Sequence, residues 1–207
     1  MPDPEGEASH GRVVLVRHGE TEWSRAGRHT GRTDVGLTPL GERQARSLAP
    51  ALVARSFGRV LVSPLERAQR TARLAGLTGF ETHGDLAEWD YGRYEGLTTE
   101  QIVAQYGDDW LVWDADGERY PLPGESLERL GERVDGVLSE IAPTLVAGLD
   151  VLLVAHGHVL RVLASRWIGQ APRLGARLVL STGALSELGL AHGRRAILHW
   201  NVAAPPG

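Results

Sequence analysis

The sequence contains no cysteine, and this absence excludes several kinds of chemistry. Disulfide bonds, zinc sites built on thiolates and phosphatases with a cysteine nucleophile all require that residue. Lysine is absent as well, since all 22 basic residues are arginine. The chain therefore cannot form a lysine Schiff base, act as a pyridoxal phosphate enzyme or carry the lysine-dependent phosphate loop of NTPases.

Long apolar runs and an excess of positive charge are also missing. Runs such as residues 151–155 are far shorter than the ~20 residues that a membrane-spanning helix needs. The acidic N-terminal stretch shows no targeting segment. The 22 basic and 26 acidic residues give a net charge of −4, which argues against nucleic-acid binding but permits a local anion pocket. We therefore expect a cytoplasmic protein that binds neither membranes nor nucleic acids.

The size and composition predict one globular domain. The chain has 207 residues, of which 42% are apolar and 23% charged, as in ordinary soluble proteins. We expect residues 1–11 to form a loose tail. Residues 85–125 are rich in Trp, Tyr, Asp and Gly, and we interpret them as a lid-like segment over a substrate.

Short β-branched runs alternate with helical patterns along the chain. Residues 13–16, 60–62 and 151–154 predict strands that are buried on both faces. Thr38, Ser63 and Ser126 are typical helix caps, the first two being followed by proline. Further patterns predict helices near residues 98–106, 108–113 and 158–167, and strands at 177–180, 185–190 and 196–200. The alternation predicts a three-layer α/β/α sandwich with a mostly parallel central sheet.

Basic and imidazole side chains follow three of the predicted strands. Arg17 and His18 come directly after the first strand, Arg67 follows the second, and His156 follows the third. Ligands of such sheets bind beyond the carboxyl ends of the strands, so these side chains should meet at one edge. Arginine is well suited to binding phosphate, and a neutral imidazole is a competent nucleophile toward phosphorus. Nearby arginines would keep an imidazole neutral by lowering its pKa.

These motifs resemble the histidine phosphatase superfamily, whose fold is phosphoglycerate-mutase-like. RHGETEWS at residues 17–24 is similar to the opening motif of that family. The similarity continues through GRHTGRTDVGLTPLGERQA at 27–45, SPLERAQRTA at 63–72, LAEWDYGRYEGLT at 86–98 and VAHGHVLRVL at 154–163. The fourth block looks closer to acid phosphatases and sugar-bisphosphate phosphatases than to glycolytic mutases.

The resemblance implies a role for each matching residue. His18 would be the nucleophile that becomes phosphohistidine, and Glu88 would donate a proton to the leaving group and later act as a base. Burial would raise the pKa of Glu88 while the arginines would lower it, and the sequence leaves that balance open. The remaining implied site residues are the second pocket histidine, the phosphate-binding residues and those at the substrate mouth: His156, Arg17, Arg67, Gly157, Thr30, Gly31 and Ser24. Ser24 stands where the family often has asparagine.

The predicted reaction is hydrolysis of a small phosphorylated metabolite without a metal or cofactor. The interval between Glu88 and His156 is short for a mutase and is more acidic than basic, which favours release of the product. A cofactor-dependent phosphoglycerate mutase remains the alternative, followed by a non-catalytic binding relative. Neither the aspartates near residues 108–116 nor His156 with His158 has the partners of a metal site. The C-terminal strands would permit a homodimer.

Overall fold

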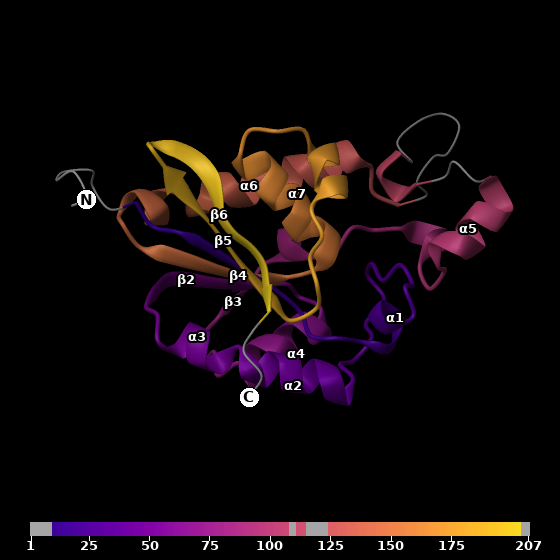
Figure 1. The fold of residues 1–207 in the computed structure, drawn as a ribbon, viewed down its shortest axis with the longest axis horizontal. Helices are drawn as coiled ribbons and strands as arrows, with labels where there is room; N and C mark the ends of the chain where they lie inside the picture. The colour runs from indigo at the N-terminus through magenta and orange to yellow at the C-terminus, as the bar shows by residue number, and fades with distance from the viewer. Residues whose placement is uncertain (1–9, 108–110, 115–123, 204–207) are drawn as a thin grey trace.

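A six-stranded sheet forms the centre of the protein in the computed structural model, which describes residues 10–107, 111–114 and 124–203 (Figure 1). The strands lie in the order β3-β2-β4-β1-β5-β6. Their bounds are β1 Val13–Arg17, β2 Phe57–Val62, β3 Glu81–Thr82, β4 Asp150–Ala155, β5 Ala184–Ala191 and β6 Arg194–Ala203.

Most neighbouring strands in this sheet are parallel. Strand β4 lies between β1 and β2 and is parallel to both, and β2 is parallel to β3. Strand β5 is antiparallel to β1 and to β6, so a hairpin completes one side of the sheet. The carboxyl ends of β1, β2 and β4 consequently lie at the same edge.

Helices cover both faces of the sheet (Figure 1). Helices α2, α3 and α4 lie below it in this view, α6 and α7 lie above it, and α1 and α5 lie beyond the strand ends. The predicted three-layer α/β/α architecture is thus confirmed. The helices are α1 Glu22–Arg25, α2 Pro39–Ser47, α3 Ala49–Val53, α4 Glu66–Leu74, α5 Thr99–Tyr106, α6 Leu127–Val146 and α7 Gly157–Trp167. The 3₁₀ turns are η1 Gly84–Leu86, η2 Gly92–Tyr94, η3 Val112–Asp114 and η4 Pro172–Arg177.

The apolar run of β1 explains why the sheet is covered twice. Val13 and Leu15 belong to the core shared with α6 and α7, whereas Val14 and Val16 belong to the core shared with α3, α4 and Leu48 at the end of α2. Successive side chains of a strand point to opposite faces. An uninterrupted apolar strand therefore requires helices on both sides, and all four residues are at most 1% exposed.

Two of the three predicted helix caps are observed. The Thr38 hydroxyl accepts the Gly41 N–H at 3.0 Å, and the Ser126 hydroxyl accepts the Arg129 N–H at 3.2 Å. Such bonds satisfy backbone donors that a helix leaves free in its first turn. Helix α2 therefore begins at Pro39 and α6 begins at Leu127, as predicted.

The prediction that Ser63 caps α4 is wrong. The helix begins at Glu66, and its N-cap residue Leu65 makes no side-chain capping bond. The carboxylate of Asp34, distant in sequence, instead accepts the Glu66 N–H at 3.0 and 3.1 Å. The Ser63 hydroxyl accepts the Leu65 N–H ahead of the helix at 3.3 Å and lies 2.6 Å from the ring nitrogen Nε2 of His156.

The predicted strand at residues 177–180 is not formed either. The 3₁₀ turn η4 ends at Arg177, and the carbonyls of Val179 and Leu180 accept side-chain N–H groups of Trp200 and Arg17 rather than pairing with a strand. The short strand β3 was not predicted. Of the helix expected near residues 108–113, positions 108–110 lie outside the described residues, and η3 occupies the end of that stretch. The predicted tail at residues 1–11 also lies largely outside them.

Candidate active site

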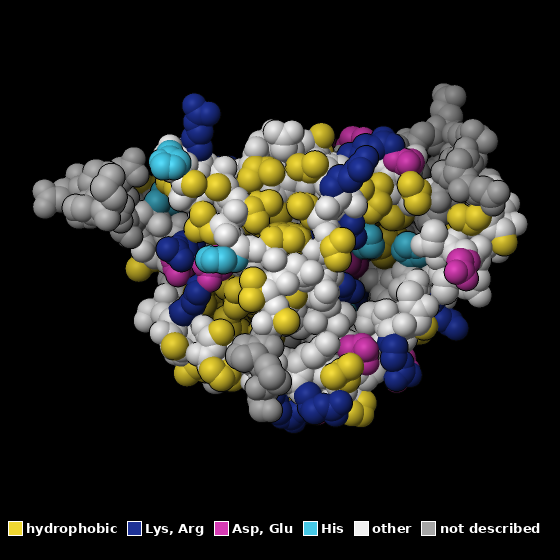
Figure 2. Space-filling model, viewed as in Figure 1, with side chains coloured by type: hydrophobic (Ala, Val, Ile, Leu, Met, Phe, Trp, Pro, Cys, Tyr) yellow, Lys and Arg dark blue, Asp and Glu magenta, His cyan; other side chains and the backbone are white. Residues whose placement is uncertain are grey.

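A pocket of about 180 Å³ opens where β1 and β4 end. Figure 2 shows a hollow on the side of the molecule where α1 and α5 lie, with histidine and arginine side chains gathered in it. The pocket is lined by Arg17, His18, Ser24, Gly27, Arg28, His29, Thr30, Glu88, Tyr91 and His158. Of the four strand-end side chains predicted to meet, Arg17 and His18 line this pocket together with side chains from distant parts of the chain.

His18 follows β1 directly and is only 5% exposed. Its Nδ1 lies 2.7 Å from the carbonyl oxygen of Gly19. A carbonyl can only accept, so Nδ1 carries the proton and Nε2 keeps its lone pair. Burial, followed by the charges of Arg67 and Arg17, holds the pKa of His18 well below its ordinary value of 6.5. The imidazole is therefore neutral at physiological pH, and its Nε2 bonds to no atom of the described residues.

Arg17 supplies a buried donor without a partner. Its NH1 donates to the carbonyl of Leu180, whereas its Nε is buried and bonds to no atom of the described residues. Gly157 packs against this guanidinium, and a Cβ at that position would come within 3.3 Å of Nε. An unsatisfied buried N–H costs about 1–3 kcal/mol, so this one favours an anionic ligand.

Arg67 is fully buried in the first turn of α4. Its Nε donates to Nδ1 of His156 at 3.1 Å. Its other nitrogens donate to the carbonyls of Thr33, Gly31 and Thr30 at 2.9, 2.8 and 3.2 Å. One guanidinium thus fixes both the second histidine and the loop at the pocket mouth.

These bonds define the protonation of His156. Nδ1 accepts from Arg67, so in the neutral ring Nε2 carries the hydrogen and donates to the Ser63 hydroxyl at 2.6 Å. Burial and the charge of Arg67 hold the pKa of His156 well below its ordinary value. The rings of His156 and His18 lie 5.0 Å apart between centroids. Sequence reasoning placed Ser63 at a strand end but missed this contact.

Glu88 is 6% exposed and binds three backbone N–H groups. Oε1 accepts from Trp89 at 3.0 Å and from Val159 at 2.9 Å, while Oε2 accepts from His158 at 3.0 Å. Two of these donors belong to the first turn of α7. Burial raises the pKa of Glu88, but the interactions with His158, including the hydrogen bond from its backbone N–H, outweigh it and hold the pKa well below 4.5. The balance left open by the sequence therefore favours the carboxylate.

His158 lies against Glu88 inside an aromatic cluster. Its Nδ1 is 2.6 Å from the Tyr91 hydroxyl oxygen and 3.8 Å from Oε2 of Glu88. Its ring contacts those of Trp113 and Trp89 at centroid distances of 5.0 and 5.9 Å. Sequence reasoning left the role of His158 open and did not place Tyr91 in the site. In the sequence, the pair of histidines on either side of Gly157 was the pattern that could have indicated a role for His158 in the site.

The remaining predicted site residues lie around the pocket in different ways. Ser24 lines it, but its hydroxyl donates to the Thr21 carbonyl at 3.0 Å and accepts the Thr21 N–H at 2.9 Å, which caps α1. Thr30 also lines the pocket. Gly31 is held by Arg67 and has no room for a side chain, since a Cβ would lie 2.2 Å from Oε1 of Glu95.

Two acidic side chains in the described part of the predicted lid pair with arginines. Asp90 pairs with Arg32 at 2.8 Å, and Glu125 pairs with Arg133 at 2.6 Å. Positions 108–110 and 115–123 of the lid lie outside the described residues. Within the described ranges, no three His, Asp or Glu side chains are grouped so that they could hold a metal ion. The helices of these ranges include none with the length and apolar character to cross a bilayer.

Comparisons with known proteins agree with this geometry. Residues 13–203 match the histidine phosphatase superfamily (branch 1), so the chain belongs to that family. An acid phosphatase of Mycobacterium tuberculosis is 42% identical, with 89% of each chain covered. A 2,3-bisphosphoglycerate-dependent phosphoglycerate mutase of Azorhizobium caulinodans is 37% identical over 83% of this chain and 88% of its own. The solved structure of the open reading frame Rv3214 of M. tuberculosis superimposes with a TM-score of 0.86 at 39% identity, covering 94% of this chain and 99% of that one.

Proposed function

We propose that the protein hydrolyses phosphate monoesters of small metabolites through a covalent phosphohistidine on His18. The observation that carries this proposal is the state of His18, a buried neutral imidazole whose Nδ1–H is bonded to Gly19 and whose Nε2 is free. An imidazole held in this tautomer is oriented as a nucleophile toward phosphorus.

The bound phosphoryl group would be stabilised by arginine and backbone donors. The unpartnered Nε of Arg17 can donate to one of its oxygens, and Arg67 adds a second positive charge beside His156. Phosphoryl transfer depends mainly on positioning and on such electrostatic stabilisation. Because the arginines can supply this stabilisation, we propose that the reaction needs no metal ion.

Two displacements complete the proposed reaction. His18 Nε2 forms a bond to phosphorus as the ester bond breaks, and the leaving oxygen takes a proton from the acid at Glu88. Water then attacks the phosphohistidine while Glu88 accepts the proton of the water, and the nitrogen–phosphorus bond breaks. One carboxyl group can serve both steps because the first step leaves it deprotonated.

Hydrolysis is favoured over mutase activity by the arginine content of the pocket. Among the described residues that line it, Arg17 and Arg28 are the cations, and mutases of this family are expected to retain their bisphosphate with further basic residues. The mutase relative at 37% identity keeps phosphoglycerate mutase as the second candidate. Asp90 and Glu125 pair with arginines, so these two carboxylates add little to this choice.

A panel of phosphate esters tests the proposal. We expect phosphate release from p-nitrophenyl phosphate, sugar bisphosphates and 3-phosphoglycerate, with one ester preferred. Interconversion of 2- and 3-phosphoglycerate that outpaces phosphate release would select the mutase instead. Binding without turnover of any ester would indicate a non-catalytic relative.

A further inference from the structure

The environment of Glu88 stabilises its anionic form, whereas its proposed role as an acid requires a proton. Three backbone N–H groups donate to its carboxylate at 2.9–3.0 Å, and two of them come from the N-terminus of α7. Hydrogen bonds to the charged form and the positive end of a helix both stabilise a carboxylate. A group held as an anion in this way is a poor store for the proton that a leaving alkoxide requires.

His158 is placed to relieve that conflict. Its Nδ1 lies 3.8 Å from Oε2 of Glu88, and its backbone N–H donates to the same oxygen. The Tyr91 hydroxyl, 2.6 Å from Nδ1, fixes the ring in this orientation, and Trp89 and Trp113 pack around it. A hydroxyl can donate to a neutral nitrogen or accept from a protonated one, so Tyr91 accommodates both states of His158.

We propose that His158 and Glu88 share the proton that is delivered to the leaving group, with His158 as the positioning and proton-holding residue. This inference rests on the proposed phosphatase function. Binding of a phosphate dianion adds negative charge to the pocket, and the pair takes up one proton from solvent in response. For the transfer, the proton on Nδ1 of His158 leaves the Tyr91 hydroxyl and moves to Oε2 of Glu88 as their 3.8 Å separation shortens to hydrogen-bond distance. Glu88 then passes the proton to the leaving oxygen as the ester bond breaks. Water attack on phospho-His18 returns a proton to the pair.

The charged and titratable groups around His158 determine whether its ring is neutral or protonated. Burial lowers the pKa of His158 and outweighs the attraction of Glu88, so the ring is neutral in the free protein. Arg161 on the same helix and Arg17 on β1 lower this pKa further. His29 faces the ring from the loop after α1, and Tyr91 stays a phenol because burial raises its pKa well above 10. A bound dianion would offset the two arginines.

A comparison of ester types tests the shared proton. His158→Asn keeps a polar atom near the position of Nδ1 but cannot hold a proton. Its hydrolysis of glycerol 2-phosphate should fall roughly 10²-fold while that of p-nitrophenyl phosphate falls by less than about tenfold, because phenolate departs with little protonation. The rate with the alkyl ester should also decline from a lower pH than in the wild type, since Glu88 alone loses its proton sooner. Equal losses on both esters, or an unshifted profile, would overturn the inference.

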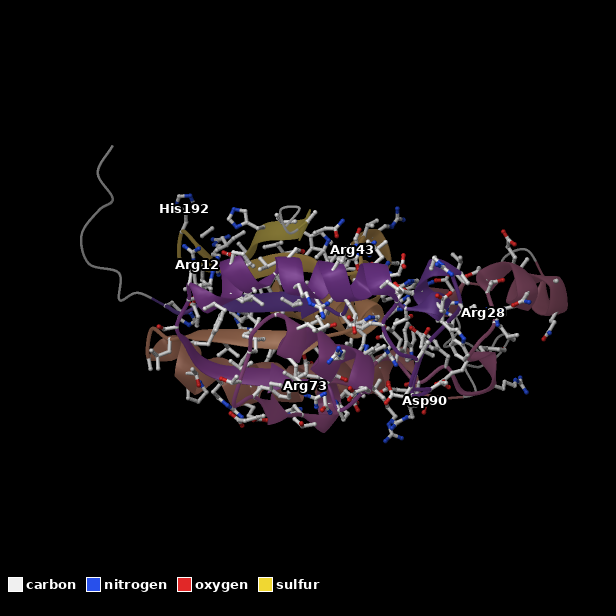
Figure 3. All side chains as sticks on the ribbon, turned by 90° about the horizontal axis from the view of Figure 1, so that it is seen from below. Arg12, Arg28, Arg43, Arg73, Asp90 and His192 are labelled. Atoms are coloured by element: carbon white, nitrogen blue, oxygen red, sulfur yellow. The ribbon has the colours of Figure 1, made fainter. Side chains whose placement is uncertain are left out.

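His192→Asn is the matched control. His192 is exposed in the turn between β5 and β6, at the opposite end of the molecule from Arg28 and Asp90 (Figure 3). Its φ of 51° suits asparagine, so this variant should behave as the wild type on both esters. If the wild type itself releases no phosphate from any ester, the proposed function fails, and the role of His158 fails with it for that separate reason.

A direct measurement keeps the inference testable even if His158→Asn does not fold. Side-chain ¹⁵N NMR of the wild type at pH 7 should show His158 neutral in the free protein and protonated, in part or fully, when sulfate is bound. Sulfate serves as the probe because it brings no titratable proton of its own. A ring that stays neutral with sulfate bound would overturn the shared proton.

Discussion

Replacing Glu88 with glutamine should lower both the stability of the fold and the rate of catalysis. The three backbone hydrogen bonds to the carboxylate allow the effect on stability to be estimated separately. The carboxylate accepts from Trp89, Val159 and His158. An amide has one acceptor oxygen, so its NH₂ group must face at least one of these N–H donors. Leaving one buried donor unsatisfied costs about 1–3 kcal/mol. Glutamine carries no charge, so the variant no longer bears the free-energy cost of burying one. This gain offsets part of the stability lost as the other two hydrogen bonds weaken.

We therefore expect Glu88→Gln to lower the free energy of unfolding at pH 7 by about 1–3 kcal/mol. In a chain of this size that corresponds to a Tm about 2–12 °C lower. Because the pKa of folded Glu88 lies below 4.5, the carboxylate contributes stability above that pH and loses it as the pH falls further. Urea denaturation at pH 7 and below pH 4 should thus show a gap between variant and wild type that narrows in acid.

The catalytic effect should depend on the leaving group. Loss of general acid catalysis costs about 10²–10⁴ in rate for an alkyl phosphate and much less for p-nitrophenyl phosphate. The two rates are measured on the same variant, so general damage cancels in their ratio. Equal losses on both esters, or an unchanged unfolding curve at pH 7, would refute the reasoning about Glu88.

The other predictions concern the nucleophile, the buried arginine and metal ions. His18→Ala should abolish turnover, and wild-type enzyme quenched during turnover should carry phosphate that is labile to acid and stable to base; an acid-stable adduct would contradict a phosphohistidine. Arg67→Met should destabilise the fold by about 1–3 kcal/mol in urea denaturation, because buried acceptors lose their donor, whereas Arg166→Met at the surface pair with Asp135 should cost about 1 kcal/mol or less. Similar losses of unfolding free energy in the two arginine variants would contradict the idea that burial makes Arg67 more important for stability than Arg166. Prolonged EDTA treatment should leave phosphatase activity within assay error, and a loss that Mg²⁺ or Zn²⁺ restores would mean that the reaction depends on metal.

The strand ends were predictable because a buried parallel sheet leaves a strong pattern. The run at residues 13–16 is apolar without interruption, and Arg17 and His18 follow it at once, so both the strand and its reactive neighbours could be read from the chain. The caps Thr38 and Ser126 were predictable for a similar reason, since each acts within its own helix turn.

Contacts across the fold could not be predicted in this way. Asp34 caps α4 from a distant loop, and Ser63 bonds His156 rather than its own helix. The sequence left the protonation of Glu88 undecided because burial and the nearby arginines were expected to act in opposite directions. The contacts with His158 that decide the balance become visible only when the segments meet in space. Ser24 was expected among the site residues, yet its hydroxyl donates to the Thr21 carbonyl and its oxygen accepts the Thr21 N–H.

Four consecutive residues at the start of α7 serve the pocket from different directions. His156 meets Arg67, Gly157 packs on Arg17, His158 faces Tyr91, and Val159 donates to Glu88. Each residue of an α-helix is turned about 100° from the one before it, so these contacts depend on how the helix is rotated about its axis. Lengthening or shortening the chain by one residue at this point would misdirect all four contacts together. At the junction between β4 and α7, this chain should therefore tolerate a change of side chain better than an insertion or deletion.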